Sequence, residues 1–385
     1  MPASLETLFW ICLIVGLYPY AGYPLCIALL KAIRPRPVRS GPVTPTVTVV
    51  ISAYNEASHL AATVRNKLTH DYPAALLDVM VVSDGSTDGT DEVLQMLASQ
   101  EARVSYLRQD PRRGKTAALN AAVERARGEL IVFSDANSIY RPDTVRRLVE
   151  VFADPEVGYA SGRMLYVDPR GSLVGDGCTA YMRYENALRR YESAVGSVVG
   201  VDGAVDAIRR SLYRPMRSDQ LPDFVLPLSV VEQGYRVVYV PQAVLEEETL
   251  TNESAEYRMR VRVALRALWA LWDKRALLNP LRFPLFSWQL ASHKLLRYLS
   301  FAPLAVAAVC SWLLVPRSGL YLTITAAQGV AAALALAATL GPKQLRAFPV
   351  TRYCYYFVLL NWASAVAFGR FIRGDKQAVW QPRTG

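Results

Sequence analysis

The chain has 385 residues, of which 52% are hydrophobic, and it carries a formal net charge of +10. Its five scattered cysteines form no CxxC pair and it has only three histidines, so neither a disulfide framework nor a multi-histidine metal site is supported. Lysines and arginines cluster beside apolar segments, not along a basic track interleaved with aromatic residues, so we expect no nucleic-acid binding.

An apolar stretch near the start, residues 8–30, is long enough to cross a bilayer. Cations follow it at Lys31, Arg34, Arg36 and Arg39, which predicts that its far end faces the cytoplasm. The stretch lacks a basic leader and a clear cleavage site, so we interpret residues 1–35 as a transmembrane helix and not as a signal peptide. A proline-rich linker follows it.

The next part, residues 36–255, alternates between apolar runs and helical patterns. The strand signals lie at 46–52, 79–83 and 130–134, and the helix signals at 58–69, 88–98, 115–126 and 142–153. Further strand-like runs occur at 158–167 and 237–240. This alternation predicts an α/β domain with a Rossmann-like, mostly parallel sheet and right-handed crossovers.

Two acidic clusters follow buried-strand signals in this part. Asp84 closes one apolar run and Asp135 closes another. The carboxyl ends of parallel strands are where open α/β sheets bind ligands, so the pair indicates a site for a nucleotide and its metal. The alternative is that both clusters only form ordinary turns at strand ends.

Beyond residue 255 the chain becomes apolar again. Arg258, Arg262 and Arg266 recur every four residues, which predicts a basic amphipathic helix, and we expect residues 256–292 to lie at a membrane interface. Apolar segments at 295–315, 319–340 and 353–368 predict transmembrane elements within residues 293–373, before a tail at 374–385. The third segment is short, so it could tilt or re-enter instead of crossing fully.

The middle part resembles glycosyltransferase family 2, the inverting nucleotide-sugar transferases with a GT-A fold. The resemblance covers roughly residues 46–250 and rests on strings that occur in the family's order, at 49–56, 83–90, 113–120, 133–137, 203–210 and 223–227 with 234–236. It implies a GT-A domain flanked by N- and C-terminal transmembrane helices.

For the donor, the resemblance implies a uridine diphosphate sugar. Ala53, Tyr54 and Glu56 would line the uracil and ribose pocket, and Asp84 would accept a hydrogen bond from the base. A buried carboxylate is selective there, because a base that lacks the donor leaves it unpaired. Lys115 would place a cation at the phosphates, although a solvated helix start explains it as well.

For the metal, the resemblance implies Mg²⁺ or Mn²⁺ at the family's Asp-x-Asp position. Here the string is Asp135-Ala136-Asn137, so an amide replaces the second carboxylate and removes one ligand charge. Hard divalent cations accept both oxygen types. We therefore expect Asp135 to bind the metal, with Asn137 the less certain ligand.

For the acceptor, the resemblance implies that Asp223 is the catalytic base. Pro222 replaces the acid that often precedes this residue, and Asp223 could instead be the N-cap of a helix over 224–232. On the acceptor side of the site we expect Asp202 or Arg209.

One departure bears on what is made. The Gln-x-x-Arg-Trp string of cellulose- and hyaluronan-type synthases is missing, and the nearest equivalent is 256–262, where Arg258 or Arg262 could meet either the donor pyrophosphate or lipid phosphates. Four apolar segments are also few for a polymer channel. We therefore expect a hexosyltransferase that moves one sugar to a lipid-linked or membrane-delivered acceptor.

The expected setting is the synthesis of glycolipid or polysaccharide for the cell envelope. The enzyme would be a multi-pass protein of the bacterial inner membrane, in contact with lipids and with a cytosolic catalytic domain. A processive polysaccharide synthase stays open, because residues 376–382 resemble tails of exopolysaccharide transferases. A nucleotidyltransferase would need a glycine-rich phosphate loop, which 52–56 is not, and an inactive scaffold would be expected to lose the acids.

Overall fold

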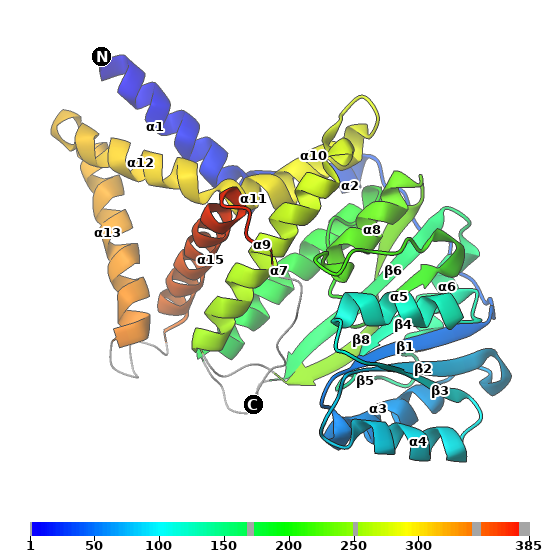
Figure 1. Ribbon diagram of the computed structural model, residues 1–385. Coiled ribbons are helices and arrows are strands. Elements are labelled where there is room, and N and C mark those ends of the chain that lie inside the picture. The colour runs from blue at the N-terminus through cyan, green and yellow to red at the C-terminus, as the bar shows by residue number, and fades with distance from the viewer. Residues whose placement is uncertain (1, 168–172, 249–252, 341–347, 377–385) are drawn as a thin grey trace.

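The computed structural model describes residues 2–167, 173–248, 253–340 and 348–376. A sheet domain lies at one side of the molecule and a group of long helices at the other (Figure 1). Of the predicted tail string, only Lys376 falls within the described residues.

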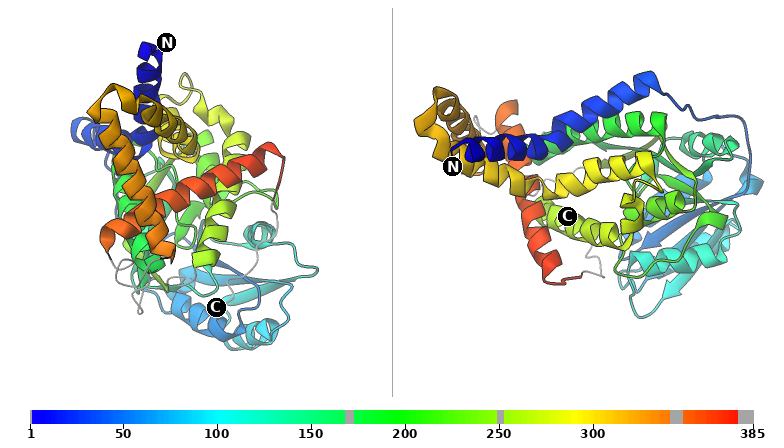
Figure 2. Two further views of the ribbon diagram at one scale, coloured as in Figure 1. Left: turned by 90° about the vertical axis from the view of Figure 1, so that its left-hand side faces the viewer. Right: turned by 90° about the horizontal axis from the view of Figure 1, so that it is seen from above.

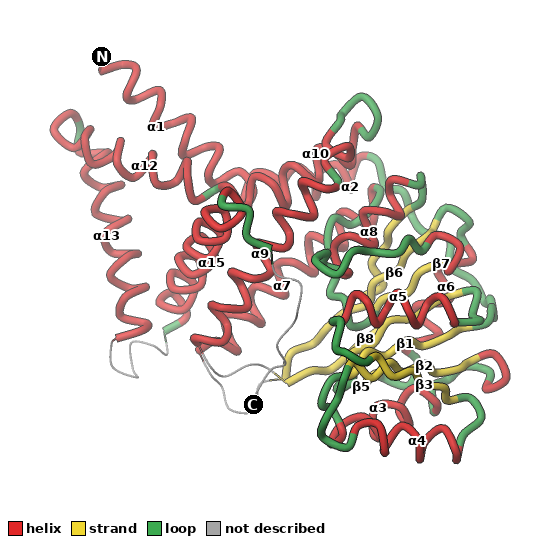
Figure 3. Tube along the Cα trace, in the orientation of Figure 1, coloured by secondary structure: helices red, strands yellow, loops and turns green. Residues whose placement is uncertain are grey.

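The domain is built on one eight-stranded sheet in the order β3-β2-β1-β4-β7-β6-β8-β5. Its strands, shown in Figure 3, are β1 Val47–Ala53, β2 Leu77–Asp84, β3 Val104–Gln109, β4 Leu130–Asp135, β5 Ile139–Tyr140, β6 Val157–Val167, β7 Asp206–Arg209 and β8 Arg236–Glu248. Strands β3, β2, β1 and β4 are parallel, as are β6 and β8, whereas β7 runs antiparallel to β4 and β6, and β5 to β8. The predicted α/β class with a mostly parallel sheet is confirmed.

Helices cover both faces of the sheet. On one face lie α3 Ala57–Leu68, α4 Thr90–Gln100 and α6 Thr144–Glu150, and on the other α5 Lys115–Arg125 and α8 Pro222–Glu232. Because side chains alternate along a strand, Val49 and Ile51 of β1 join the first core, whereas Val50 joins the second. Both faces of the central strands are therefore apolar, which explains their continuous hydrophobic runs.

The remaining helices form the candidate membrane spans and the segments that connect these spans to the sheet domain. They are α1 Pro2–Leu17, the π-helical turn η1 Tyr18–Gly22, α2 Tyr23–Ile33, α7 Leu173–Val195, α9 Glu253–Asp273, α10 Pro284–Leu290, the π-helical turn η6 Ala291–Leu295, α11 Leu296–Leu299, α12 Phe301–Leu314, α13 Gly319–Leu340 and α15 Pro349–Ile372. In the described residues three helices are long and apolar enough to cross a membrane, Ser4–Ile33, Gly319–Leu340 and Pro349–Ile372. A bent pair, Pro284–Leu299 with Phe301–Arg317, would make a fourth. The last segment is a 24-residue helix, longer than the sequence pattern predicted.

The first helical segment is attached to the sheet domain. Helix α2 lies alongside α7 (Figure 2), and Tyr23 and Ile27 are fully buried there. The Tyr23 hydroxyl donates to Glu192 of α7 at 2.5 Å. The C-terminal half of this candidate span therefore packs on protein.

Candidate active site

The carboxyl ends of β1 and β4 border a cavity of about 340 Å³, which we call the donor cavity. Most of the sequence-predicted site residues line it, namely Tyr54, Glu56, Lys115, Asp135, Asn137, Asp202, Asp223 and Arg262. Residues from strand ends and from helices α5, α8 and α9 thus converge on one space, as the topology of an open α/β sheet favours.

Lys115 and Asp135 form the ion pair at the centre of this cavity. Lys115 begins α5, Asp135 ends β4, and Nζ lies 2.6 Å from Oδ1. Burial alone would lower the pKa of Lys115, but the Asp135 and Asp223 carboxylates outweigh burial and raise it above its usual value. The ammonium group is therefore charged, and it offers a fixed cation beside the start of a helix.

Asp223 lies in the first turn of α8. The N-cap of this helix is Leu221, with no side-chain capping bond, so the N-cap interpretation of Asp223 is wrong. Burial raises the pKa of Asp223, and Asp135 adds to the rise while Lys115 opposes it. The carboxylate sits against Gly203, whose φ of +85° and missing side chain make room for it. A carboxylate held in this way can accept a proton more readily than an exposed one.

Asp206 lies beside this cluster at the start of β7, and sequence reasoning did not single it out. It is fully buried, it pairs with Phe133 across the sheet, and it accepts a hydrogen bond from the Tyr159 hydroxyl at 3.0 Å. Burial raises the pKa of Asp206 to about 7, with Asp223 contributing. A second buried carboxyl group with a raised pKa thus lies beside the cluster.

Asp84 has a different environment from Asp135. Its carboxylate accepts hydrogen bonds from the Gln109 side chain at 3.0 Å and from the backbone N–H groups of Arg113 and Gly114 at 2.7 and 2.8 Å. It therefore fixes the loop that leads into α5. The Arg112 guanidinium on this loop stacks on the Tyr54 ring at 3.5 Å. Contact of Asp84 with a nucleobase stays a prediction.

Two buried cations bind oxygen atoms next to the site, and the sequence analysis did not identify either of them. Lys67 is fully buried, and its Nζ donates to the carbonyl of Ser138 at 2.7 Å, so it holds the turn that follows Asp135. Arg189 of α7 pairs with Asp202 at 2.6 Å. Helical positions that look solvent-exposed in the pattern face the interior here, because each cation finds an oxygen partner.

The basic helix α9 contributes one wall. Arg262 lines the donor cavity, and so does Arg266, whose Nη2 donates to the Gln220 carbonyl at 2.5 Å. The four-residue spacing that predicted an amphipathic helix also brings both side chains to one face. Arg258, one turn earlier, is exposed and is not among the described residues that line the cavity.

Arg209 lies apart from this cavity. It pairs with Leu130 at the start of β4, whereas Asp135 ends that strand. Its guanidinium donates to the carbonyls of Val157, Phe152 and Asp154, and so fastens the sheet to the segment after α6. The structure thus separates Arg209 from the acceptor side, where the sequence had placed it. Ala53 is buried within β1, directly before Tyr54.

Asp135 and Asn137 present oxygen atoms of the kind that a divalent cation accepts. Asp135 keeps 37% of its side chain exposed, and Asn137 lines the same cavity. Within the described ranges no three His, Cys, Asp or Glu residues gather as a metal cluster. One carboxylate and one amide leave room for phosphate and water oxygens, and the ammonium of Lys115 already marks this carboxylate as a place where a cation is stabilised.

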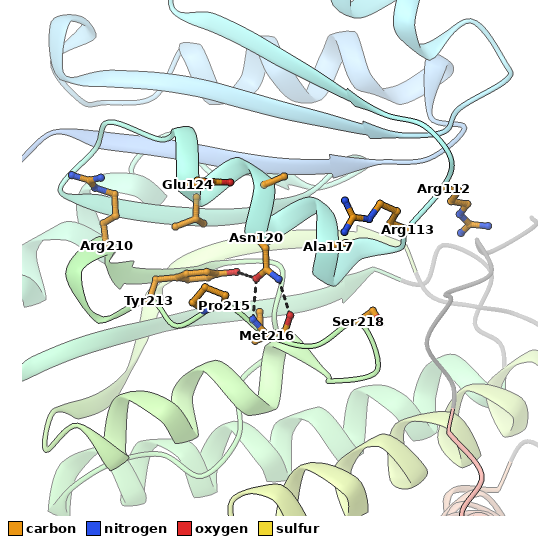
Figure 4. A pocket seen from close by; sticks show the side chains of 12 residues that line it. Arg112, Arg113, Ala117, Asn120, Glu124, Arg210, Tyr213, Pro215, Met216 and Ser218 are labelled. Atoms are coloured by element: carbon orange, nitrogen blue, oxygen red, sulfur yellow. Dashed lines mark hydrogen bonds between the residues drawn. The ribbon is translucent and has the colours of Figure 1, made fainter.

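A larger hollow of about 920 Å³ lies along α5 (Figure 4), and its lining residues do not include Asp135 or Asp223. Asn120 bonds there to the Tyr213 hydroxyl at 2.8 Å and to the carbonyl of Met216 at 2.7 Å. Three arginines and a single acid, Glu124, contribute its charges. Because Asp135, Asp202 and Asp223 line the smaller donor cavity and not this hollow, we assign the chemistry to the donor cavity.

Comparison with known proteins identifies this part of the chain. Residues 48–216 match the family model of glycosyl transferase family 2. An N-acetylglucosaminyltransferase of Azorhizobium caulinodans is 30% identical over 219 residues, which are 53% of this chain and 55% of the relative. A beta-monoglucosyldiacylglycerol synthase of Nostoc sp. is 26% identical over 168 residues, 43% of this chain and 36% of the relative. The chain thus spans about one third to one half of these relatives.

A solved structure is similar over nearly the whole chain. It is a mannosyltransferase from Pyrobaculum calidifontis in complex with GDP-Man and Mn²⁺, 25% identical, with a TM-score of 0.70. The similarity covers 94% of this chain and 98% of that one. The likeness confirms the predicted GT-A fold and extends it to the helices outside the sheet domain.

Proposed function

We propose, from the premise that residues 48–216 make this chain a member of glycosyl transferase family 2, that it is a membrane-bound inverting hexosyltransferase. It moves a sugar from a UDP-sugar to a hydroxyl group of a lipid-linked or membrane-delivered acceptor, in the synthesis of envelope glycolipid or polysaccharide. One observation carries this proposal. Helix α9 supplies Arg262 and Arg266 to the donor cavity and also packs on the candidate span α15.

The proposed reaction is an in-line displacement. The acceptor oxygen bonds to the anomeric carbon, the bond from that carbon to the diphosphate oxygen breaks, and the nucleoside diphosphate leaves with the electron pair. The acceptor proton passes to Asp223. The direction of the pKa shift of Asp223 supports this role, because burial raises the pKa and so makes the carboxylate a stronger base than an exposed one.

Cations on two sides of the cavity would neutralise the negative charge of the donor pyrophosphate. Lys115 on α5 and the arginines Arg262 and Arg266 on α9 offer cations for the pyrophosphate. Tyr54 and Glu56 would face the nucleoside, with Asp84 behind them. Because the mannosyltransferase that resembles this chain was solved with GDP-Man, a GDP-sugar is the donor against which UDP-sugars must be tested.

A divalent cation, Mg²⁺ or Mn²⁺, would be held by Asp135 and Asn137. When bound, it would neutralise charge on the departing diphosphate. Lys67 and Tyr140 would hold Asp135 and Asn137 in place. Lys67 donates to the carbonyl of Ser138 and lies over the Tyr140 ring, and the Tyr140 hydroxyl donates to the carbonyl of Phe133 in β4.

The cellular setting is part of the proposal. We infer a multi-pass protein of the bacterial inner membrane whose catalytic domain lies in the cytosol. A processive polysaccharide synthase is the alternative within the family. In its support, the chain is also similar to a poly-beta-1,6-N-acetyl-D-glucosamine synthase of Staphylococcus aureus, which is 25% identical over 256 residues.

The test is release of nucleoside diphosphate by purified, detergent-solubilised protein from a panel of UDP-sugars and GDP-mannose, with and without EDTA. We expect release from a UDP-sugar that EDTA stops. Asp135→Asn removes one ligand charge at nearly constant volume, so we expect it to abolish release while the thermal unfolding midpoint stays within a few degrees. Full activity of Asp135→Asn in excess EDTA would refute the metal role, and release from GDP-mannose alone would refute the donor assignment.

A further inference from the structure

The Lys115–Asp135 ion pair joins two groups that the proposed function assigns to different ligands. Lys115 would bind the donor pyrophosphate, and Asp135 would bind the divalent cation. In the structure the two side chains bind each other, since Lys115 Nζ lies 2.6 Å from Asp135 Oδ1. Within the described residues, Lys115 is the one cation that pairs with Asp135. An internal cation therefore occupies the carboxylate that an external cation would need.

The backbone on both sides of Lys115 is held in place. The Asp84 carboxylate accepts hydrogen bonds from the N–H groups of the two preceding residues, at 2.7 and 2.8 Å. The Thr116 hydroxyl donates to the Gln220 carbonyl at 3.1 Å. The side chain of Lys115 lines the donor cavity with 28% of its surface exposed. A change of partner therefore needs only a rotation of this flexible four-carbon side chain.

The charges at Asp135 make the ammonium an effective competitor of a metal ion. Asn137 stands where the family's Asp-x-Asp motif has a second acid, so Asp135 is the single carboxylate of the proposed metal site. The Lys115 ammonium neutralises this one charge. It would also repel a second cation on the same carboxylate, because like charges at close range interact appreciably near a protein surface. A divalent cation should therefore bind Asp135 better once the ammonium has moved.

Other acids of the donor cavity do not replace Asp135. They are Glu56, Asp202, Asp223 and Glu247. Asp202 is already paired with Arg189 at 2.6 Å. In the described parts of the chain, no three acids, histidines or cysteines form a group that could hold a metal ion. The attraction of these acids for a cation is present with or without Lys115, so it cancels when variants at position 115 are compared.

We infer that Lys115 competes with the divalent cation for Asp135, and that it exchanges Asp135 for the donor diphosphate when the donor binds. This inference rests on the proposed function and adds an order of events to it. The diphosphate attracts the ammonium, and the Asp135 carboxylate then becomes available to the cation. Lys115 thereby couples metal binding to donor binding, and without a nucleotide the protein should hold the cation weakly.

The test measures binding to the full chain in detergent and needs no turnover. Mn²⁺ binding is followed without nucleotide by electron paramagnetic resonance of the free ion, and binding of UDP and of GDP is followed by calorimetry in EDTA. We expect Lys115→Met to bind Mn²⁺ roughly tenfold more tightly than wild type, because a repelling charge is removed. The same variant should bind the nucleotide roughly tenfold more weakly, because the diphosphate loses a charged donor. A merely structural defect would weaken both, so the opposite directions identify the exchange.

Three further variants control this result. Lys115→Gln, a second uncharged side chain, should give the same two shifts, whereas Lys115→Arg keeps the charge and should bind Mn²⁺ as weakly as wild type. Lys274 also pairs with a glutamate, Glu232 at 2.5 Å, but it does not line the donor cavity. Lys274→Met should therefore bind both ligands like wild type.

A double variant locates the gained metal ion. If the ion binds at Asp135, adding Asp135→Asn to Lys115→Met should abolish the gain. Equal or weaker Mn²⁺ binding by Lys115→Met, a gain that survives Asp135→Asn, or unchanged nucleotide affinity would overturn the exchange and leave the proposed function standing. Failure of wild type to release nucleoside diphosphate from any donor would overturn the proposed function, whereas the Mn²⁺ measurement would still decide the competition at Asp135.

Discussion

Gly203 and Asp223 show how a single missing side chain can position a carboxylate. A Cβ at Gly203 would overlap the carboxyl atoms of Asp223, and φ at Gly203 is +85°. We expect Gly203→Ala to push Asp223 from its place and to lower sugar transfer by roughly the 10²–10⁴ that a general base contributes. Steady-state transfer assays measure this loss. Nucleotide binding, measured separately, should change little.

The chain offers a matched control for this substitution. Gly234 has φ of +87°, but a Cβ there would meet nothing within 4 Å. Both alanine variants carry the same left-handed strain, about 1–2 kcal/mol, so only the overlap with Asp223 differs. Equal loss of transfer in Gly203→Ala and Gly234→Ala would show that strain alone is responsible.

Asp206 gives the site a pH-dependent stability. Its folded pKa of about 7 lies above its usual value of 3.8, so the folded state binds the proton more tightly than the unfolded state does. The free energy of unfolding therefore falls as pH rises from about 4 to 7 and then levels off, by at most about 4 kcal/mol.

The side chain in Asp206→Asn cannot ionise, so the free energy of unfolding of this variant should not fall between pH 4 and 7 on account of this position. We expect its thermal unfolding midpoint to exceed that of wild type at pH 8 and the difference to shrink toward pH 5. A difference that is the same at both pH values would contradict the raised pKa.

At single positions, the sequence predicted which residues meet at the strand ends and failed where a side chain's position depends on a distant partner. Asp135 and Lys115 follow from their positions at a strand end and a helix start. Nothing in the local pattern around Lys67 shows that the Ser138 carbonyl, 71 positions away, will bury its charge. Arg209 was misplaced because the antiparallel pairing of β7 carries it to the far end of β4.

Helix α7 contacts both the sheet domain, at β6 and β8, and the helices α2 and α15. One face of this helix buries Glu185, Arg189 and Glu192. Glu192 accepts hydrogen bonds from the Tyr23 hydroxyl at 2.5 Å and from the Val199 N–H at 3.1 Å, and it lies 2.6 Å from His293 Nδ1. A single carboxylate thus joins α2, the segment after α7 and η6.

We expect Glu192→Ala to destabilise the protein by about 3–5 kcal/mol, because it leaves several buried polar groups without a partner. Thermal unfolding of detergent-purified protein measures this loss. Glu156→Ala is the control, since Glu156 is half exposed and its pair with Arg36 should contribute less than about 1 kcal/mol. Similar midpoints for both variants would argue against the joining role of Glu192.

The apolar strands of the parallel half were predictable, whereas β3 of that half and the short antiparallel strands β5 and β7 were not. Strands β1, β2 and β4 are continuous apolar runs separated by helices, which is the pattern of βαβ units. Strand β7 has four residues and β5 has two, too few for a period to appear. Helix α7 was missed, and three residues of its buried face, Glu185, Arg189 and Glu192, are charged.

At the scale of the whole molecule, the donor cavity lies between the strand ends of the sheet and helix α9. Asp135 ends β4, and Arg262 and Arg266 of α9 line the same cavity as Asp135 and Asp223. The same helix contacts α15, so the proposed chemistry is built into the junction between the sheet domain and the apolar helices. Under the proposed function, a water-soluble donor and a membrane-delivered acceptor would meet at Asp223 in this junction.

The most direct measurement compares Asp223→Asn with wild type in isolated membranes supplied with labelled UDP-sugars. Asp219→Asn is the control, since Asp219 is paired with Arg217 and Lys376 and does not line the donor cavity. We predict that Asp223→Asn lowers transfer of label to membrane-extractable product by about 10²–10⁴ while UDP affinity stays at the wild-type value, and that Asp219→Asn transfers normally. Near-normal transfer by Asp223→Asn would contradict the assignment of Asp223 as the base and, with it, the account of the site.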